Sequence, residues 1–181
     1  MDLRHLVTRF AGDGVLQAIV LRPGRELPAH AVERARAIPG RGLDGDRSAL
    51  RARRPGGSKR EVTLLQAEHL PLIAAWLRRD AIDPLLLRRN LIVAGLNLLS
   101  ARSPWRDTPV VLHIGEAVVL EITGPCDPCS KMERDLGPGA YNVLRGHGGV
   151  TARVLVEGMI TVGDRVWLAT GNGQVEPSPS G

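Results

Sequence analysis

Two cysteines three residues apart carry the clearest chemical potential in this sequence. Cys126 and Cys129 flank an Asp-Pro pair, and they are the only cysteines among 181 residues. The prolines and the glycine around them favour a loop. Two thiols at this spacing can share a soft metal, form a disulfide or carry sulfur as a persulfide. The spacing alone does not choose among these chemistries.

The segments on either side predict where these thiols lie. Residues 118–123 alternate in a way typical of a strand, and residues 110–114 predict its partner. The Gly115-Glu116 pair between them indicates a two-residue hairpin turn. A short helical pattern follows the cysteines. We therefore expect both thiols at the end of a strand, in a loop of the kind that often carries function.

The rest of the chain predicts a mainly β fold. Further strands are expected at residues 15–22, 32–38, 61–65, 152–156, 159–162 and 165–168, and one clear helix at residues 67–79. Short strands separated by glycine-rich turns favour a β-barrel with a few short helices over a parallel βαβ sheet. We expect one domain over residues 1–170 and a disordered tail over residues 171–181.

Composition limits the classes of partner. The net charge is +5, which raises the question of nucleic acid, but three Trp, one Tyr and one Phe are scattered along the chain and give no base-stacking surface. The cations gather at residues 41–60, which suits a compact anionic ligand equally well. No signal peptide is apparent, and no apolar run approaches the ~18 residues of a membrane span. We expect a soluble, cytoplasmic protein that acts on a small molecule.

Two polar segments are further candidates. Arg88, Arg89 and Asn90 interrupt apolar runs, so they either find buried partners, face a cavity, or lie at a surface turn. In the glycine-rich segment 39–47, the backbone can approach a ligand closely. There, Asp46 either holds Arg47 or Arg88 by charge-assisted bonds or caps a turn.

Together these segments resemble the MOSC domain, the module named for the C-terminal domain of molybdenum cofactor sulfurase, in its stand-alone bacterial form. The matching pieces, in order, are residues 42–47, 62–65, 88–91, 126–129, 146–149 and 158–166. The resemblance implies a MOSC-type β-barrel that binds a molybdenum cofactor of the molybdopterin type. Cys129, which follows a proline, matches the cysteine that ligates the metal, whereas the role of Cys126 stays open.

The resemblance also suggests which residues contact the cofactor. Arg88 and Asn90 match a cofactor-contacting motif, and they suit a phosphate and a heterocycle edge respectively. Lys131 and loop arginines such as Arg47, held by Asp46, would keep a thiolate ionised.

The segment 146–149 supplies the remaining candidates. Backbone amides of Gly148 and Gly149 can approach a phosphate, as in anion-binding nests. His147 can donate to an oxo group or move protons, because its ordinary pKa is near neutrality.

Three functions remain open at this level. The first, which the resemblance implies, is an oxidoreductase that reduces N-hydroxylated compounds with the Cys129 thiolate on molybdenum. A separate protein would supply its electrons, because nothing in the chain predicts a flavin or nicotinamide site. The second is a sulfur carrier or cofactor-delivery protein that receives sulfur from a donor protein and passes a persulfide from Cys129 or Cys126 to a partner. The third is a zinc or dithiol site, disfavoured because one cysteine pair supplies two of the usual four ligands, even with His113 and His147 nearby.

Overall fold

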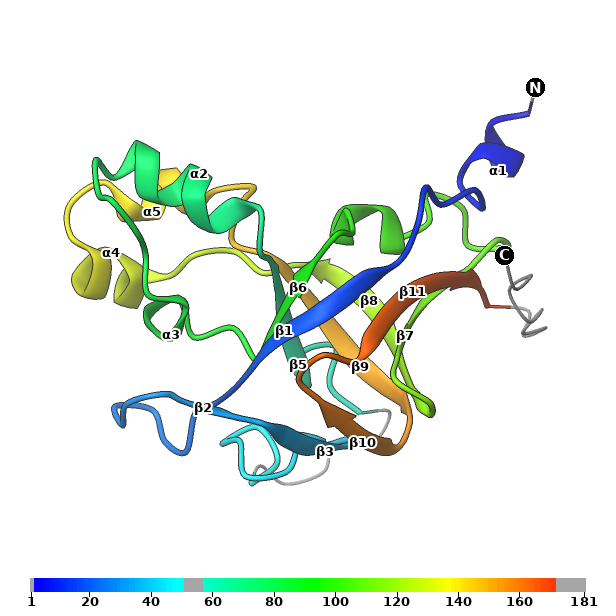
Figure 1. Ribbon diagram of the computed structural model, residues 1–181, viewed down its shortest axis with the longest axis horizontal. Coiled ribbons are helices and arrows are strands. Elements are labelled where there is room, and N and C mark those ends of the chain that lie inside the picture. The colour runs from blue at the N-terminus through cyan, green and yellow to red at the C-terminus, as the bar shows by residue number, and fades with distance from the viewer. Residues whose placement is uncertain (1, 51–56, 172–181) are drawn as a thin grey trace.

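A closed β-barrel dominates the computed structural model, which describes residues 2–50 and 57–171 (Figure 1). Among these residues, seven strands close the barrel in the order β11-β7-β8-β9-β5-β6-β1, and β11 pairs back to β1. The strands are β1 (Gly14–Leu21), β5 (Val62–Gln66), β6 (Leu91–Ala94), β7 (Val110–Ile114), β8 (Val118–Pro125), β9 (Val150–Val156) and β11 (Arg165–Thr170). The predicted mainly β fold is confirmed.

Smaller elements complete the strand framework. Strand β2 (His30–Val32) pairs with β1 outside the ring, and a second sheet joins β10 (Gly158–Thr161), β3 (Arg34–Ile38) and β4 (Gly42–Leu43). The barrel pairs are antiparallel except β5 with β6, which run parallel. A parallel neighbour requires a long crossover, and residues 67–90 provide it.

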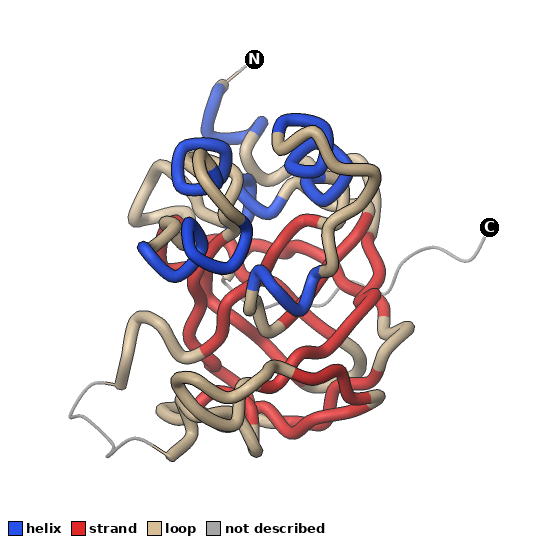
Figure 2. Tube along the Cα trace, turned by 90° about the vertical axis from the view of Figure 1, so that its left-hand side faces the viewer, coloured by secondary structure: helices blue, strands red, loops and turns tan. Residues whose placement is uncertain are grey.

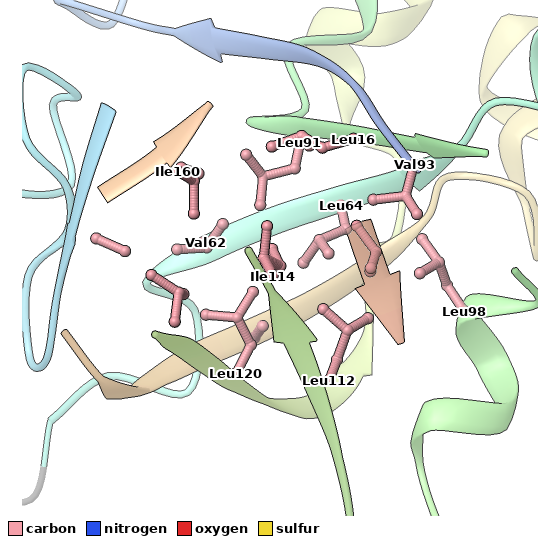
Figure 3. Close-up of a cluster of buried hydrophobic side chains, with 14 of the residues drawn as sticks. Leu16, Val62, Leu64, Leu91, Val93, Leu98, Leu112, Ile114, Leu120 and Ile160 are labelled. Carbon is pink, nitrogen blue, oxygen red and sulfur yellow. The ribbon is translucent and has the colours of Figure 1, made fainter. Parts of the chain in front are cut away.

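Alternation of apolar side chains explains the barrel strands. In β7, Val110, Leu112 and Ile114 are buried while the residues between them are partly exposed. Figure 3 shows Leu64, Leu91 and Ile114 converging in the barrel interior, with Ile160 of β10 and Leu98 toward its two ends. Each such side chain contributes about 2 kcal/mol through burial.

The helices gather mainly on one side of the barrel. Figures 1 and 2 show α2 (His69–Trp76), α3 (Pro84–Leu87), α4 (Ser130–Leu136) and α5 (Ala140–Leu144) together there, whereas α1 (Leu3–Leu6) lies at the far end. The 3-10 helix η1 (Leu98–Ala101) adjoins β7 and β5. Leu65 and Ile92 pack against this helical layer, while Leu64 and Leu91 face the barrel interior. Strands β5 and β6 are thus apolar on both faces, which accounts for their unalternating sequence.

Several sequence boundaries shift. The helix predicted at residues 67–79 is shorter, because α2 ends at Trp76. The hairpin is present, but its loop has three residues rather than the two predicted, since Ile114 pairs with Val118. The expected tail, apart from Gly171, lies outside the described residues. None of the described helices has the length and apolarity to cross a membrane.

Candidate functional site

The two thiols lie in a short loop between a strand and a helix. Residues 126–129, here called the cysteine loop, follow the end of β8 and precede α4, so the predicted position at a strand's end is confirmed. Cys126 is buried, with 1% of its surface exposed, whereas Cys129 is exposed and stands at the N-cap of α4. Both are free thiols. The structure therefore separates the cysteines into an inner and an outer one.

Hydrogen bonds hold Cys126 at three atoms. Its sulfur accepts a bond from Nη2 of Arg60 at 3.1 Å, and its backbone N–H donates to the Gly149 carbonyl at 2.8 Å. Its own carbonyl accepts from Nη2 of Arg89 at 3.3 Å. The inner cysteine is thus fixed in place, with a guanidinium against its sulfur.

Arg89 connects the cysteine loop to the crossover and to the turn before β9. Its guanidinium is buried and donates to the carbonyl oxygens of Gly148 at 2.6 Å and Leu87 at 2.9 Å, besides that of Cys126. Burial lowers the pKa of Arg89, and the nearby Cys126 sulfur partly opposes this shift. Within the described residues, no carboxylate forms an ion pair with this guanidinium. Among the described residues, its hydrogen-bond partners are therefore backbone carbonyl oxygens.

Through its side chain, Arg88 contacts Gly24 and Leu27 rather than the cysteine loop. It ends α3 in the left-handed conformation, with φ of 54°, an uncommon backbone state for a residue with a side chain. Nη1 donates to the Leu27 carbonyl at 2.9 Å and Nη2 to that of Gly24 at 3.0 Å. As with Arg89, the side chain donates to neutral carbonyl oxygens. The two successive arginines bring two charges into the protein without acidic partners among the described residues.

Asn90 is the centre of a buried polar cluster. Its Oδ1 accepts from Nη2 of Arg22 at 2.8 Å and from the backbone N–H and hydroxyl of Thr63 at 3.1 and 3.0 Å. Its amide donates to Asp46 at 2.9 Å and to the Val20 carbonyl at 3.1 Å. The side chain is wholly buried, and both amide donors are used. Asn90 therefore joins β1, β5 and the 42–47 loop. The predicted hydrogen bond from Asn90 to the edge of a cofactor would need an amide donor that is already used here.

Asp46 forms its ion pair with an arginine that the sequence did not suggest. Oδ2 accepts from Nε of Arg22 at 2.9 Å and Oδ1 from Nη2 at 2.9 Å. Oδ1 also accepts from the backbone N–H and the hydroxyl of Ser48 at 2.9 and 2.8 Å, so the predicted turn cap is confirmed, while Arg88 donates to carbonyl oxygens instead. Burial alone would raise the pKa of Asp46, but the bonds from Arg22 and Ser48 lower it to about 2. The bidentate geometry explains why Arg22, at the end of β1, is preferred.

The turn at residues 146–149 presses against the cysteine loop. A Cβ atom on Gly148 would lie 2.4 Å from the Cys126 carbonyl oxygen. At Gly149, where φ is +91°, a Cβ would lie 2.0 Å from the Leu64 carbonyl oxygen. These glycines are required for close packing of backbone on backbone. Their predicted contact with a phosphate stays a prediction.

His147 packs on helix α2. Its ring meets those of His69 at 5.0 Å and Trp76 at 4.9 Å between centroids, both edge to face. The Nδ1 atoms of His69 and His147 are buried and have no hydrogen-bond partner among residues 2–50 and 57–171. Burial, followed by the neighbouring His147, lowers the pKa of His69. His113 instead stacks on Trp167, and within the described residues no three His, Cys, Asp or Glu side chains are grouped to hold a metal.

Lys131 and Arg47 occupy positions outside the buried cluster. Nζ of Lys131 lies 3.2 Å from Glu26 and 3.9 Å from Asp135, so carboxylates already compensate its charge. Arg47 is half-buried, and its backbone N–H donates to the Arg22 carbonyl at 2.8 Å. This bond places the Arg47 backbone beside the polar cluster. The predicted role of both in keeping a thiolate ionised stays a prediction.

Comparison with known proteins identifies the family. The family model described as MOSC domain matches residues 51–167, more than half of the chain. This chain belongs to the MOSC domain family. No curated protein sequence is significantly similar to it.

Solved structures share this MOSC fold. YuaD from Bacillus subtilis is 16% identical, with a TM-score of 0.69 over 87% of this chain and 96% of that one. YiiM from Geobacillus stearothermophilus is 16% identical, with a TM-score of 0.64 over 87% and 74%. YiiM from Escherichia coli is 17% identical, with a TM-score of 0.60 over 90% and 71%. At such identities the likeness establishes the fold.

A cavity of about 580 Å³ adjoins the cysteine loop of this MOSC chain. Its lining is polar and comes from the loop and from α5 with the residues after it: Asp127, Pro128, Tyr141, Asn142, Arg145 and Gly146. The sequence did not predict Tyr141, Asn142 or Arg145 as site residues, because the sequence of a short helix does not indicate which of its side chains line a cavity. Arg60 was missed as a site residue because it was one cation within a basic run. Arg89 was noted with Arg88 and Asn90, but the sequence indicated no contact for it.

Proposed function

We propose that this MOSC protein binds a molybdenum cofactor of the molybdopterin type at the cysteine loop and works as an oxidoreductase on N-hydroxylated compounds. The observation that carries the proposal is the charge around the loop. Arg60 donates to the Cys126 sulfur, and the buried Arg89 donates to neutral carbonyl oxygens only. A phosphate-bearing cofactor would complement cations that lack acidic partners among the described residues.

The donor set fits this group. Cys129 offers an exposed thiol, and thiolate is the soft ligand that a thiophilic metal prefers. Arg88 and Arg89 offer guanidinium groups that can bind phosphate in bidentate fashion after giving up carbonyl contacts. When bound, the molybdenum would supply oxygen-atom transfer chemistry. The family resemblance, rather than the geometry, suggests N-hydroxylated compounds as substrates.

The residues around the cysteine loop then have distinct roles. Cys129 ligates the metal, while Cys126, held by Arg60, fixes the loop that presents it. Arg89 ties this loop to the 146–149 turn. The 580 Å³ cavity receives the substrate, with Asp127 and Arg145 offering one charge of each sign at its wall. Electrons come from a separate donor protein.

Metal analysis after expression in a cofactor-competent host tests this proposal. The wild-type chain should carry molybdenum in stoichiometric amount, measured by inductively coupled plasma mass spectrometry. Cys129→Ala should lose most of it, whereas the matched variant Cys126→Ala should retain it, because only the exposed thiol is assigned to the metal. Full metal content in Cys129→Ala would contradict the assignment.

A second function, sulfur transfer, is favoured by one observation. Cys129 is exposed and makes no side-chain bond at its helix cap, so its sulfur is accessible to a donor and an acceptor protein. A cysteine persulfide on Cys129 would then be passed to a partner. Incubation with a cysteine desulfurase and mass spectrometry should reveal a sulfur adduct that reductant removes. A metal-free chain that forms this adduct would favour the carrier over the oxidoreductase.

A further inference from the structure

A second hollow, on the outer surface of the barrel, has the chemistry of a binding site. It has a volume of about 610 Å³ and is bordered by residues 101–106, by the outer sides of β7, β8 and β9, and by Lys59. The side chains used below are Lys59, Arg102, Trp105, Arg106 and Arg153. We call this hollow the basic groove. It is of the size that holds drug-like ligands in other proteins.

The charge of the basic groove is strongly unbalanced. Four of its lining side chains are cationic, and its one carboxylate, Glu121, already pairs with Arg153. No ion pair to a described carboxylate is formed by Lys59, Arg102 or Arg106. Like charges along a hollow with low-dielectric walls focus the positive potential and concentrate anions. The groove is therefore suited to an anion.

The groove also offers one aromatic surface on an ordered loop. Trp105 lines it, and the backbone N–H of Trp105 donates to the Ser103 hydroxyl at 3.1 Å while its backbone carbonyl accepts from the N–H of Thr108 at 3.3 Å. The guanidinium of Arg4 lies 5.6 Å from the Trp105 ring centroid and pairs with Asp107. The ring is thus held in place before any ligand arrives. A single ring suits one planar group rather than a run of stacked bases.

The groove borders the cysteine loop without being part of it. Thr123 donates a hydrogen bond to the Lys59 carbonyl, which fixes Lys59 against β8. The next residue, Arg60, turns to the Cys126 sulfur. Of these adjacent residues, Lys59 therefore lines the groove and Arg60 contacts the cysteine loop.

We propose that the basic groove binds an anionic ligand that carries a planar ring, of the size of a mononucleotide. The anion contacts Arg102 and Arg106, and the ring packs on Trp105. This site is independent of the molybdenum cofactor. It gives the protein a second ligand, either a substrate group or a regulator.

Calorimetric titration of the full chain with adenosine 5′-monophosphate at low ionic strength tests the proposal. This probe carries both the phosphate and the ring, so it should bind more tightly than orthophosphate or adenosine alone. Binding should weaken as salt is added, because exposed charges are screened within roughly 10 Å at 0.1 M salt. Orthophosphate binding as tightly as the nucleotide would overturn the role of the ring.

Matched variants locate the site. Arg106→Ala should weaken nucleotide binding about tenfold through loss of one charge-assisted contact. Arg34→Ala removes the same charge from exposed β3, outside the groove, and should leave binding unchanged. Trp105→Leu should abolish the advantage of the nucleotide over orthophosphate, with circular dichroism confirming that each variant is folded. Equal losses in Arg106→Ala and Arg34→Ala would overturn the proposal.

Discussion

Cys126 and Cys129 should react with thiol reagents at very different rates. Cys129 is exposed, whereas Cys126 has 1% of its surface exposed and is bonded through sulfur, N–H and carbonyl. In the native protein, a chromogenic disulfide reagent should therefore label one thiol quickly and the other only on unfolding. Cys129→Ser should lose the fast phase, and Cys126→Ser should keep it. A fast phase that survives in Cys129→Ser would contradict this assignment.

Asp46 should stabilise the protein in a pH-dependent way. Its folded pKa, about 2, lies below the ordinary 3.8, so its contribution is complete above about pH 4 and is lost as the pH falls through 2. The shift corresponds to about 2 kcal/mol. Asp46→Asn leaves the charge of Arg22 buried and unpaired, which should cost roughly 3 kcal/mol in the free energy of unfolding at pH 7.

Urea unfolding at several pH values measures the contribution of Asp46. The difference in the free energy of unfolding between wild type and Asp46→Asn should be largest at neutral pH and should decrease toward pH 2. Asp44→Asn, an exposed change two residues away, should alter the free energy by less than about 0.5 kcal/mol. A difference that stays constant from pH 7 to pH 2 would rule out this role for the ion pair.

Single residues show where sequence reasoning stops. The apolar runs around Arg88, Arg89 and Asn90 correctly indicated polar groups in need of partners. They did not indicate Arg22 or Asp46, because those residues lie 68 and 44 positions from Asn90 and join it only through the barrel topology. One signal was available in Arg22, a lone charge at the end of an apolar strand.

At the scale of elements, the 146–149 turn should tolerate substitution at one glycine and not at another. Gly146 and Gly149 both have positive φ, but a Cβ at Gly146 has nothing within 4 Å, whereas one at Gly149 would lie 2.0 Å from the Leu64 carbonyl. Gly146→Ala should therefore cost about 1 kcal/mol from backbone strain alone. Gly149→Ala should cost at least about 3 kcal/mol, because the β9 strand must also move from β5.

Thermal unfolding compares the two glycine variants directly. The melting temperature should fall by a few degrees in Gly146→Ala and several times further in Gly149→Ala. Cys126 should also become more reactive in Gly149→Ala, since its N–H donates to the Gly149 carbonyl. Equal destabilisation by the two substitutions would show that the turn does not pack as described.

Elements with local signals were predictable, and elements defined by distant contacts were not. Alternation located β7 and β8, and β-branched residues located β1. The parallel pairing of β5 with β6 has no local signature, because it depends on the crossover between them. The extra residue in the β7–β8 loop was missed because Gly-Glu also fits a two-residue turn.

At the scale of the whole molecule, the closed barrel has an interior surface and an exterior surface. Its interior is filled by apolar side chains, so function must lie on the outside or at the ends. The helical layer covers one side of the barrel (Figure 1) and borders the cysteine loop. The basic groove lies on the outer sides of β7, β8 and β9. The short strands with glycine-rich turns and the family resemblance both predicted the barrel, but no local pattern indicated that β1 and β11 meet.

This β1–β11 contact should be the weak point of the barrel. Two register pairs, Gly14 with Val166 and Val15 with Arg165, join these strands, and bonds of Leu16 to Asp164 and Gly163 extend the contact. The β8–β9 ladder is far longer. Because local opening follows the number of protecting contacts, the Leu16 and Gly163 amides should exchange with solvent faster than the Val154 amide in β9.

A substitution beside the β1–β11 contact, here called the seam, tests whether the barrel opens there first. A Cβ on Gly14 would lie 2.3 Å from the Ala94 carbonyl oxygen, so Gly14→Ala must push β1 away from β6, whereas a Cβ on Gly12 meets nothing within 4 Å. Gly14→Ala should cost about 2 kcal/mol and speed amide exchange most at Leu16 and Gly163. Gly12→Ala should leave both exchange rates near those of the wild type. If Gly14→Ala accelerated exchange equally in β8 and β9, the barrel would open as one cooperative unit and not at its seam.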